Sequence, residues 1–347
     1  MIQLTHKNVH NYFKINGYHL NANDLCRVAY SYIKEGNSNE QAIGEFLLDW
    51  FDSKDYIEMT TSGTTGLPKV VRLQKRAMIQ SALATGDFFN LQPGDKALLC
   101  LPVKFIAGKM MLVRSFILGL DLNVVEPSTE PLALNTIQYD FVAMVPLQVQ
   151  NSIKDLKNVK KLIIGGAKID SSLEEKLLPL KTEIYETYGM TETITHIAAK
   201  KVGENFFSVL PNVKITTDNR DCLMIKVPTI SEKPIITNDL VKIIGENQFT
   251  FLGRIDNIIN SGGVKLIPEQ IEAKLIEKIN TRFFVTGIPD SILGEKLILV
   301  IEGEKRDFPN DFFDILDKYE KPKKIVFVPK FKENENGKLL RKSSIGL

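Results

Sequence analysis

Residues 59–69, MTTSGTTGLPK, bring together several groups that bind phosphate. They are Thr60, Thr61, Ser62, Gly63, Thr64, Thr65, Gly66 and Lys69. Glycines let backbone N–H groups turn toward an anion, hydroxyls add donors and a lysine adds a positive charge. A Walker A loop needs four residues between its glycines and Lys-Ser or Lys-Thr after the second, and this segment has neither. It predicts a phosphate-binding loop of another kind, with a polar surface turn as the alternative.

A second segment, Tyr188-Gly189-Met190-Thr191-Glu192, follows an expected strand at 183–187. An aromatic face suits a purine, a hydroxyl suits a phosphate oxygen and a carboxylate suits a hard divalent cation. Taken alone, the segment is equally consistent with a strand end followed by a Thr-Glu pair that caps a helix.

The elements that must position these segments follow an α/β pattern from about residue 96. Short runs rich in Val, Ile and Leu suit strands buried on both faces of a sheet, and helical stretches separate them. The expected strands are 96–101, 122–125, 141–145 and 160–164, with a helix at 108–118. Residues 22–51 predict two further helices, the first capped by Asn23 or Asp24.

After about residue 256 the pattern predicts a separate, small α+β unit. Its expected elements are a helix at 268–279, strands at 283–287 and 296–302, a helix at 308–319 and a strand at 324–328. We therefore expect a large α/β domain at 1–252 and a small α+β domain at 257–347.

Composition indicates an ordinary globular protein of 347 residues, with 44% hydrophobic and 25% charged residues. A net charge of +2 gives no reason to expect nucleic acid as a partner. The three cysteines are far apart, which predicts neither a disulfide framework nor a metal site and favours the cytoplasm. No apolar run approaches membrane-spanning length and the N-terminal residues lack the apolar core of a signal, so we expect no membrane insertion.

The loop at 59–69 closely resembles the phosphate loop of the adenylate-forming enzymes, the superfamily of acyl-CoA synthetases, luciferases and peptide-synthetase adenylation domains. That family usually continues Lys-Gly-Val, whereas this chain has Lys69-Val70-Val71. The resemblance implies that residues 61–66 and Lys69 bind ATP.

The same resemblance assigns roles around the second segment. It implies that Tyr188, beside Gly189, stacks on adenine, that Thr191 contacts the α-phosphate and that Glu192 holds Mg²⁺. Upstream, Gly165-Gly166-Ala167 resembles the Gly-Gly-Ala segment that lies along the adenine.

Further motifs follow in the family's order. Thr237-Asn238-Asp239 resembles the family's Thr-Gly-Asp, which implies that Asp239 binds the ribose hydroxyls, with Asn238 in place of glycine. Residues 253–269 resemble the family's hinge segment. There the resemblance implies that Arg254 contacts ribose, that Asp256 is the hinge and that Gly262-Gly263 faces coenzyme A. Asn336-Gly337-Lys338 resembles the motif of the catalytic lysine, here Lys338.

The resemblance covers residues 59–341 and does not extend to the first 58. Relatives usually have a longer stretch before the phosphate loop, so we expect the N-terminal region to be shortened. A shortened N-terminal half leaves a homodimer as one possible assembly.

Residues 101–114 stand where the family's acyl-pocket segment begins. Phe105 replaces the usual histidine and Gly108 is kept. With an arginine at position 114, the segment resembles that of the o-succinylbenzoate–CoA ligases of menaquinone biosynthesis. Their acid carries a second carboxylate, which does not react and needs a cation. Lys104 and Lys109 are further candidates, and the alternative for Arg114 is an exposed helix residue.

The resemblance implies an AMP-forming ligase that adenylates a carboxylic acid with ATP and Mg²⁺ and passes the acyl group to coenzyme A. The alternatives are an aryl- or fatty-acyl–CoA ligase and a non-catalytic adenylate-binding protein. Lys69, Glu192 and Lys338 together favour an enzyme.

Overall fold

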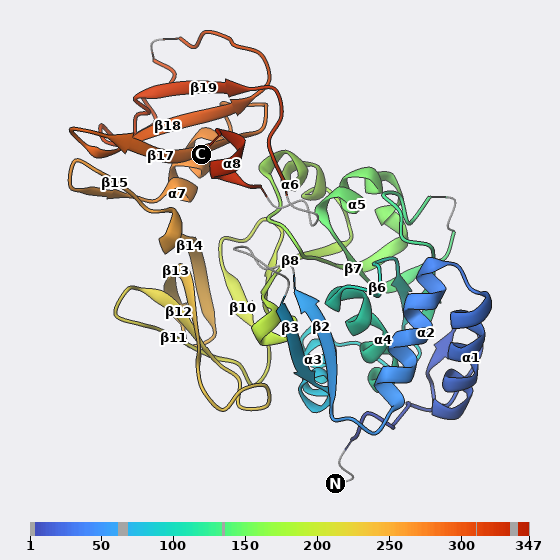
Figure 1. Ribbon diagram of the computed structural model, residues 1–347. Helices are drawn as coiled ribbons and strands as arrows, with labels where there is room; N and C mark the ends of the chain where they lie inside the picture. Colours follow the sequence, from blue (N-terminus) through green and yellow to red (C-terminus); the bar gives the residue numbers. More distant parts are fainter. Residues whose placement is uncertain (1–3, 62–68, 134–135, 310, 334–338, 347) are drawn as a thin grey trace. The chain divides into compact units, whose positions relative to one another are not determined.

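The computed structural model describes residues 4–61, 69–133, 136–309, 311–333 and 339–346 (Figure 1). The chain divides into two compact units. The first comprises residues 1–169, 173–214 and 226–235, and the second comprises 170–172, 215–225 and 236–347. Each unit is described by itself.

The first unit is built on a sheet with the strand order β1-β5-β4-β6-β7-β8-β9-β10. The strands are β1 (Lys14–Ile15), β4 (Lys96–Leu99), β5 (Asp121–Val124), β6 (Tyr139–Met144), β7 (Val159–Ile164), β8 (Glu183–Gly189), β9 (His196–Lys201) and β10 (Phe207–Val209). Neighbours from β1 to β8 are parallel, and β9 and β10 continue antiparallel. The four strands expected between residues 96 and 164 are β4 to β7, which confirms the α/β class.

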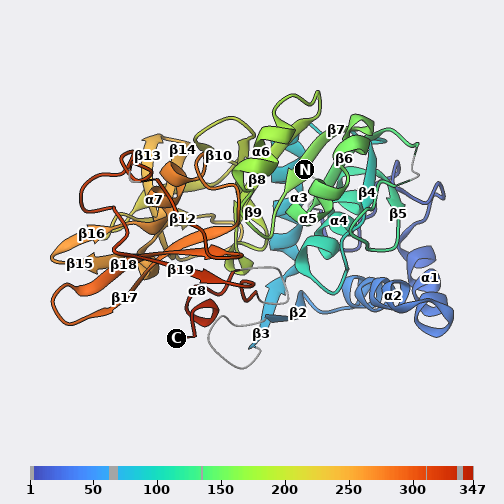
Figure 2. The ribbon, with the colours of Figure 1, turned by 90° about the horizontal axis from the view of Figure 1, so that it is seen from above.

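Helices cover this sheet. They are α1 (Ala22–Glu35), α2 (Ser38–Phe51), α3 (Lys75–Phe89), α4 (Ile106–Leu118), α5 (Pro146–Asn151) and α6 (Ser171–Leu177), the last of which begins in the second unit's short segment. Helices α1 and α2 lie side by side in both views (Figures 1 and 2). The cap of α1 is Asn21, not Asn23 or Asp24. Its side chain accepts from the backbone of Asn23 and Asp24, while the Asp24 carboxylate accepts from the Asn21 backbone.

A two-stranded hairpin flanks the segment that is predicted to bind phosphate. Strand β2 (Tyr56–Thr61) pairs antiparallel with β3 (Lys69–Gln74), and the last pair in register is Thr61 with Lys69. The expected loop therefore connects two adjacent strand ends. Residues 62–68 lie outside the described part of the chain.

The second unit contains two groups of strands. One has the order β14-β13-β12-β11, made of β11 (Lys214–Thr217), β12 (Cys222–Lys226), β13 (Ile235–Gly245) and β14 (Gln248–Arg254). The other has the order β16-β15-β18-β17, with β19 paired to β18. Its elements are β15 (Ile259–Ser261), β16 (Val264–Leu266), α7 (Pro268–Leu275), β17 (Phe283–Asp290), β18 (Gly294–Glu302), β19 (Lys324–Val328) and α8 (Arg341–Ser344).

The helix expected at 308–319 is wrong: the residues described from 311 onward form a series of turns. Phe312, Leu316 and Glu320 each donate a backbone hydrogen bond to the residue three positions earlier. Aspartates are poor helix formers. Here two of them form ion pairs, Asp314 with Lys321 and Asp317 with Lys274. The apolar spacing of the Phe residues suggested a helix, but it serves a packed aromatic cluster instead.

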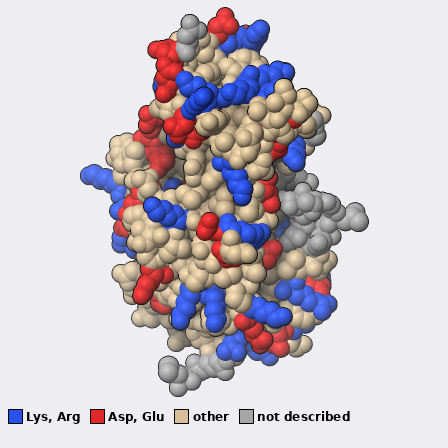
Figure 3. All heavy atoms as spheres, turned by 90° about the vertical axis from the view of Figure 1, so that its left-hand side faces the viewer, with Lys and Arg blue, Asp and Glu red and all other residues tan. Residues whose placement is uncertain are grey.

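Two further properties concern the described residues. No helix among them combines the length and the apolar character that crossing a bilayer requires. On the face drawn in Figure 3, Lys and Arg side chains lie among Asp and Glu side chains. The domain limits at 252 and 257, the cytoplasmic location and the homodimer stay predictions.

Candidate active site

The Gly165–Ala167 and Tyr188–Glu192 segments leave the same edge of the first unit's sheet. The first directly follows β7, and the second begins at the end of β8, which runs parallel beside it. Ligands of open α/β sheets bind at the carboxyl ends of the strands. The Gly165 N–H donates to the Met144 carbonyl across 3.1 Å, and the Thr187 hydroxyl donates to the Ile164 carbonyl across 2.9 Å. These bonds fix the backbone around both segments.

Gly189 lets the chain fold back closely after β8. A Cβ added there would lie 2.3 Å from the Thr195 carbonyl oxygen, so a larger residue would push the return segment away. Tyr188 is half-buried, with its ring edge-on to Phe207 at 5.9 Å between centroids. Thr191 is half-buried and Glu192 is exposed, both in the short 3-10 helix η2 (Thr191–Thr193).

Ile194 occupies a strained turn directly after η2. Its φ is 67° and its ψ is −60°, and the Thr195 N–H donates to the Thr193 carbonyl across 2.8 Å. This is a γ-turn with positive φ, a rare and costly conformation for a β-branched residue. Such strain is concentrated at functional sites, where the surrounding packing enforces it. Ile194 is buried, and the turn separates Thr191 and Glu192 from Thr195.

Two sets of predicted residues fall outside the described part of the chain. Ser62, Gly63, Thr64, Thr65 and Gly66 belong to the predicted phosphate loop, for which only the strand positions of Thr61 and Lys69 are described. Lys338 is also outside. Among the described residues, no group of three or more His, Cys, Asp or Glu side chains is arranged to hold a metal ion.

In the second unit, Arg254 joins two carboxylates. Its Nη1 donates to Asp239 Oδ1 across 3.1 Å, and its Nη2 donates to Asp256 Oδ2 across 2.8 Å. Asp239 and Arg254 are cross-strand partners in β13 and β14. The Asn238 amide also donates to Asp256, and the hydrogen bond from Arg254 is the main cause that lowers the pKa of Asp256. The residues expected around the ribose and the hinge thus form one hydrogen-bonded cluster.

Gly262 and Gly263 form the exposed turn between β15 and β16. Their φ values are 58° and 81°, a left-handed conformation that glycine adopts without strain. Their predicted role toward coenzyme A stays a prediction.

The residues at the start of α4 differ in their surroundings. Phe105 is 39% exposed at the N-cap, and the Lys104 ammonium lies 4.9 Å from its ring centroid. The Lys109 ammonium lies 4.9 Å from the ring centroid of Phe46 in α2, and burial lowers the pKa of Lys109. Gly108 is buried where the helix meets Pro102. Lys109 therefore packs against α2.

Arg114 is 2% exposed and so is not a surface helix residue. Its Nη2 donates to the Thr195 hydroxyl across 3.3 Å and lies 3.5 Å from His196 Nδ1, and its Nη1 lies 3.6 Å from the Met111 sulfur. Within the described residues its Nε has no hydrogen-bond partner and no carboxylate pairs with it. Burial lowers the pKa of Arg114 to about 10. A buried cation without a counter-charge is costly, and a bound anion would supply the missing charge.

Sequence reasoning missed Thr195 and His196, the neighbours of Arg114. His196 is 8% exposed, and Thr85 of α3 lies on its other side, with Oγ1 3.5 Å from Nε2. Burial, together with the charge of Arg114, holds the pKa of His196 well below its usual range. The only signal in the sequence was the Thr-His pair a few residues after Thr191-Glu192.

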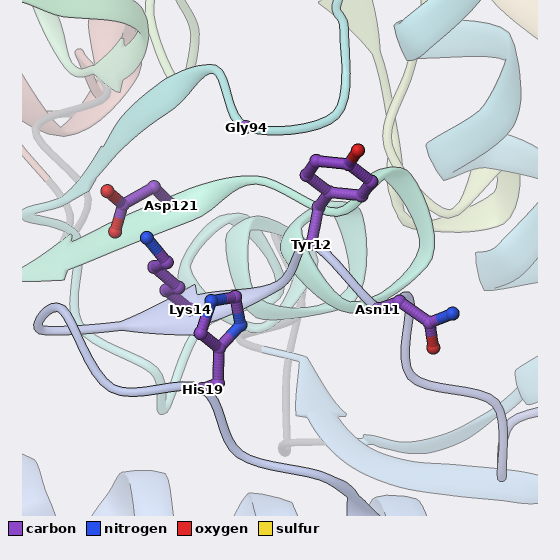
Figure 4. A pocket seen from close by; sticks show the side chains of 6 residues that line it. All are labelled: Asn11, Tyr12, Lys14, His19, Gly94 and Asp121. Carbon is purple, nitrogen blue, oxygen red and sulfur yellow. The ribbon is translucent and has the colours of Figure 1, made fainter.

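A cavity of about 270 Å³ lies beside the N-terminal segment and is lined by Asn11, Tyr12, Lys14, His19, Gly94 and Asp121 (Figure 4). Gly94 precedes β4 and Asp121 begins β5, so the cavity lies at the amino ends of parallel strands. The segments after β7 and β8 leave from the carboxyl ends. This cavity is therefore separate from the candidate active site.

Residues 34–226 match the AMP-binding enzyme family. Since the match spans more than half of the chain, the protein belongs to this family of enzymes. The predicted membership of the adenylate-forming superfamily is confirmed.

Two curated relatives are named 2-succinylbenzoate–CoA ligase. The one from Lactococcus lactis is 27% identical over 327 residues, which cover 86% of this chain and 72% of the relative. The one from Staphylococcus aureus (strain MW2) is 28% identical over 323 residues, or 82% of this chain and 65% of the relative. The chain thus spans about two thirds of the Staphylococcus relative.

Two solved structures are also similar. An acyl-CoA synthetase (AMP-forming)/AMP-acid ligase II-like protein from Dyadobacter fermentans is 34% identical, with a TM-score of 0.63, and the match covers 92% of this chain and 97% of that chain. O-succinylbenzoate coenzyme A synthetase from Bacillus subtilis, solved with ATP and magnesium, is 21% identical, with a TM-score of 0.72 and coverage of 83% and 69%. The second likeness shows the shared fold.

Proposed function

We propose that this protein is an ATP-dependent acid–thiol ligase that adenylates o-succinylbenzoate and transfers the acyl group to coenzyme A, a step of menaquinone biosynthesis. The observation that carries the substrate assignment is Arg114, buried without a carboxylate partner among the described residues. The names of the curated relatives support the same substrate.

The charge at Arg114 explains why the acid needs two carboxylates. One carboxylate reacts with ATP, and the other supplies the negative charge that the guanidinium of Arg114 lacks as a partner. An arginine presents a planar fork of N–H donors that matches a carboxylate. The buried Nε without a partner leaves part of this fork open.

In the first half-reaction, a carboxylate oxygen of the acid attacks the α-phosphorus of ATP, and pyrophosphate leaves. Thr61 to Gly66 and Lys69 bind the phosphates, and Thr191 donates to the α-phosphate. The backbone of Gly165-Gly166-Ala167 and the Tyr188-Gly189 segment hold the adenine. Lys338 offsets charge that develops on the reacting phosphate.

Magnesium fits this site as a partner of the nucleotide phosphates. Glu192 is an exposed carboxylate, and the described residues hold no acidic cluster that would bind the ion alone. Mg²⁺ is commonly held by one or two carboxylates plus substrate phosphates and water. Held by Glu192, the Mg²⁺ ion would neutralise part of the negative charge on the phosphates.

In the second half-reaction, the coenzyme A thiolate attacks the acyl carbon and AMP leaves. Asp239 and Arg254 hold the ribose, and rotation about Asp256 exchanges Lys338 for the Gly262-Gly263 turn. The turn suits this role because its backbone is exposed and free of Cβ atoms.

Exchange of labelled pyrophosphate into ATP, measured with a panel of acids, tests the proposal. We expect exchange with o-succinylbenzoate and little with benzoate or fatty acids. Exchange only with a monocarboxylic acid would favour an aryl- or fatty-acyl–CoA ligase. Tight adenylate binding without exchange for any acid would favour a non-catalytic protein.

A further inference from the structure

His196 contacts a different neighbour with each ring nitrogen. Nδ1 lies 3.2 Å from the Thr195 hydroxyl and 3.5 Å from Arg114 Nη2, and Nε2 lies 3.5 Å from Thr85 Oγ1. Three elements therefore meet at this ring: Thr85 belongs to α3, Arg114 to α4, and His196 begins β9.

The donors around the ring select one tautomer. A guanidinium only donates, so the nitrogen facing Arg114 must accept. The Thr85 hydroxyl already donates to the Ser81 carbonyl across 2.9 Å, which leaves its lone pair for a proton on Nε2. The Thr195 hydroxyl accepts from Arg114 and is free to donate to Nδ1. A neutral ring protonated on Nε2 is compatible with all three contacts, because the single lone pair of Nδ1 then faces the donors of Thr195 and Arg114 together.

We propose that His196, held as the Nε2–H tautomer by Thr85, is a positioning residue that orients Arg114 for the second carboxylate of the acid. The role in acid selection rests on the proposed function. A charged ring, protonated on both nitrogens, would place two cations side by side and remove the acceptor for Arg114. A neutral ring protonated on Nδ1 would point its N–H donor at the N–H donor of Arg114.

Substitutions separate the two nitrogens. The side-chain oxygen of asparagine lies the same number of bonds from Cβ as Nδ1, and the side-chain amide of glutamine corresponds in the same way to Nε2. His196→Asn therefore keeps the acceptor for Arg114, and His196→Gln keeps only the partner of Thr85. On the other side, Thr85→Val removes the hydroxyl and Thr85→Ser retains it.

The first measurement needs no substrate. Nitrogen-15 NMR of the labelled protein reports the tautomer of each of the four histidines, and the signal lost in His196→Asn assigns His196. We expect a neutral ring protonated on Nε2 at pH 7. A ring protonated on Nδ1, or a charged ring, would overturn the proposal whatever acid the enzyme uses.

The second measurement is the KM for o-succinylbenzoate divided by the KM for benzoate. Loss of one hydrogen bond that orients Arg114 without touching the acid is expected to change such a ratio by up to about tenfold. We expect an increase of about that size in His196→Gln and in Thr85→Val, and a ratio near that of the wild type in His196→Asn and Thr85→Ser. Equal effects of the Asn and Gln variants would refute the positioning role.

The two proposals fail in distinguishable ways. If the wild type adenylates no acid with two carboxylates, the proposed function fails and the NMR result alone decides the state of His196. If the wild type accepts o-succinylbenzoate but the tautomer differs, only the positioning role fails. His19→Leu, at an exposed histidine in the separate cavity, controls for loss of a histidine as such.

Discussion

The Arg114 guanidinium and the Thr195 hydroxyl lie 3.3 Å apart although 81 positions separate them in the chain. This hydrogen bond joins helix α4 to the segment that returns from η2 into β9. Residues expected to recognise the acid and residues expected to bind the nucleotide are thereby tied together within the first unit.

We expect Arg114→Ala to raise the KM for o-succinylbenzoate far more than the KM for benzoate. An unpaired carboxylate in a dry pocket costs on the order of 1.5–3 kcal/mol, the range for a charged hydrogen bond. Steady-state kinetics with both acids measure the difference, and the reacting carboxylate cancels between them. Equal weakening of the two acids would contradict the assignment of Arg114 to the second carboxylate.

We expect Lys338→Ala to slow adenylation severely and to spare thioester formation from preformed acyl-adenylate. A charged donor aimed at the reacting phosphate is commonly worth about 2.7–4 kcal/mol. Pyrophosphate release and thioester formation are measured separately. Lys330→Ala, at an exposed lysine of the same tail, is the matched control. Comparable losses in both half-reactions would show that Lys338 does not serve the first step alone.

We expect Asp256→Pro to block thioester formation and leave adenylation largely intact, because proline fixes φ at the proposed pivot. Asp256→Ala removes the contacts with Arg254 and Asn238 without restricting φ, so it measures their contribution alone. Both half-reactions are followed in each variant. Normal thioester turnover in Asp256→Pro would exclude this residue as the pivot.

We expect the free energy of unfolding to fall as the pH falls below about 6.5, the usual pKa of histidine. The folded state holds the pKa of His196 well below that value, so the unfolded chain binds a proton that the folded chain does not. Stability is therefore present above pH 6.5 and is lost below it, by about 1.4 kcal/mol per pH unit for one proton. Urea unfolding between pH 5 and 7 measures the slope.

His196→Asn carries no titrating group at that position and should show a smaller slope. His6, whose pKa is also lowered by burial, contributes to both proteins and cancels in the comparison. Parallel pH profiles for the two proteins would mean that His196 is not held neutral by folding.

Strands of the first unit were predictable because burial on both faces demands unbroken apolar runs. The runs that became β4, β6 and β7 each appear in the sequence as short stretches of Val, Ile, Leu and neighbouring apolar residues. The segment at 308–319 misled because aromatic residues at helical spacing also serve a cluster packed against turns. The spacing of apolar residues reports which of them are buried. In this segment a helix and a series of turns both fit the same spacing.

The candidate acid-binding residue was singled out by resemblance to a family segment, not by apolar periodicity, and its role stays a prediction. Arg114 stood out by its place in the acyl-pocket segment, and the structure shows it buried. Its contacts with Thr195 and His196 were not readable, because they depend on the return of the chain after Ile194. No local pattern predicts a positive φ at isoleucine, since only tertiary packing enforces it.

The turn at Ile194 also bears on how the acid specificity of this protein can be altered. On the proposed assignment, Thr191 and Glu192 serve the nucleotide on one side of the turn, and Thr195 and His196 serve the acid on the other. The γ-turn sets the spacing between these two pairs of residues. The hydroxyl of Thr193 supports it, because it bonds to Met190 on one side and to the Thr195 carbonyl on the other. On this assignment, we expect substitutions at 195 and 196 to change the selection of the acid while Thr191 and Glu192 keep their geometry.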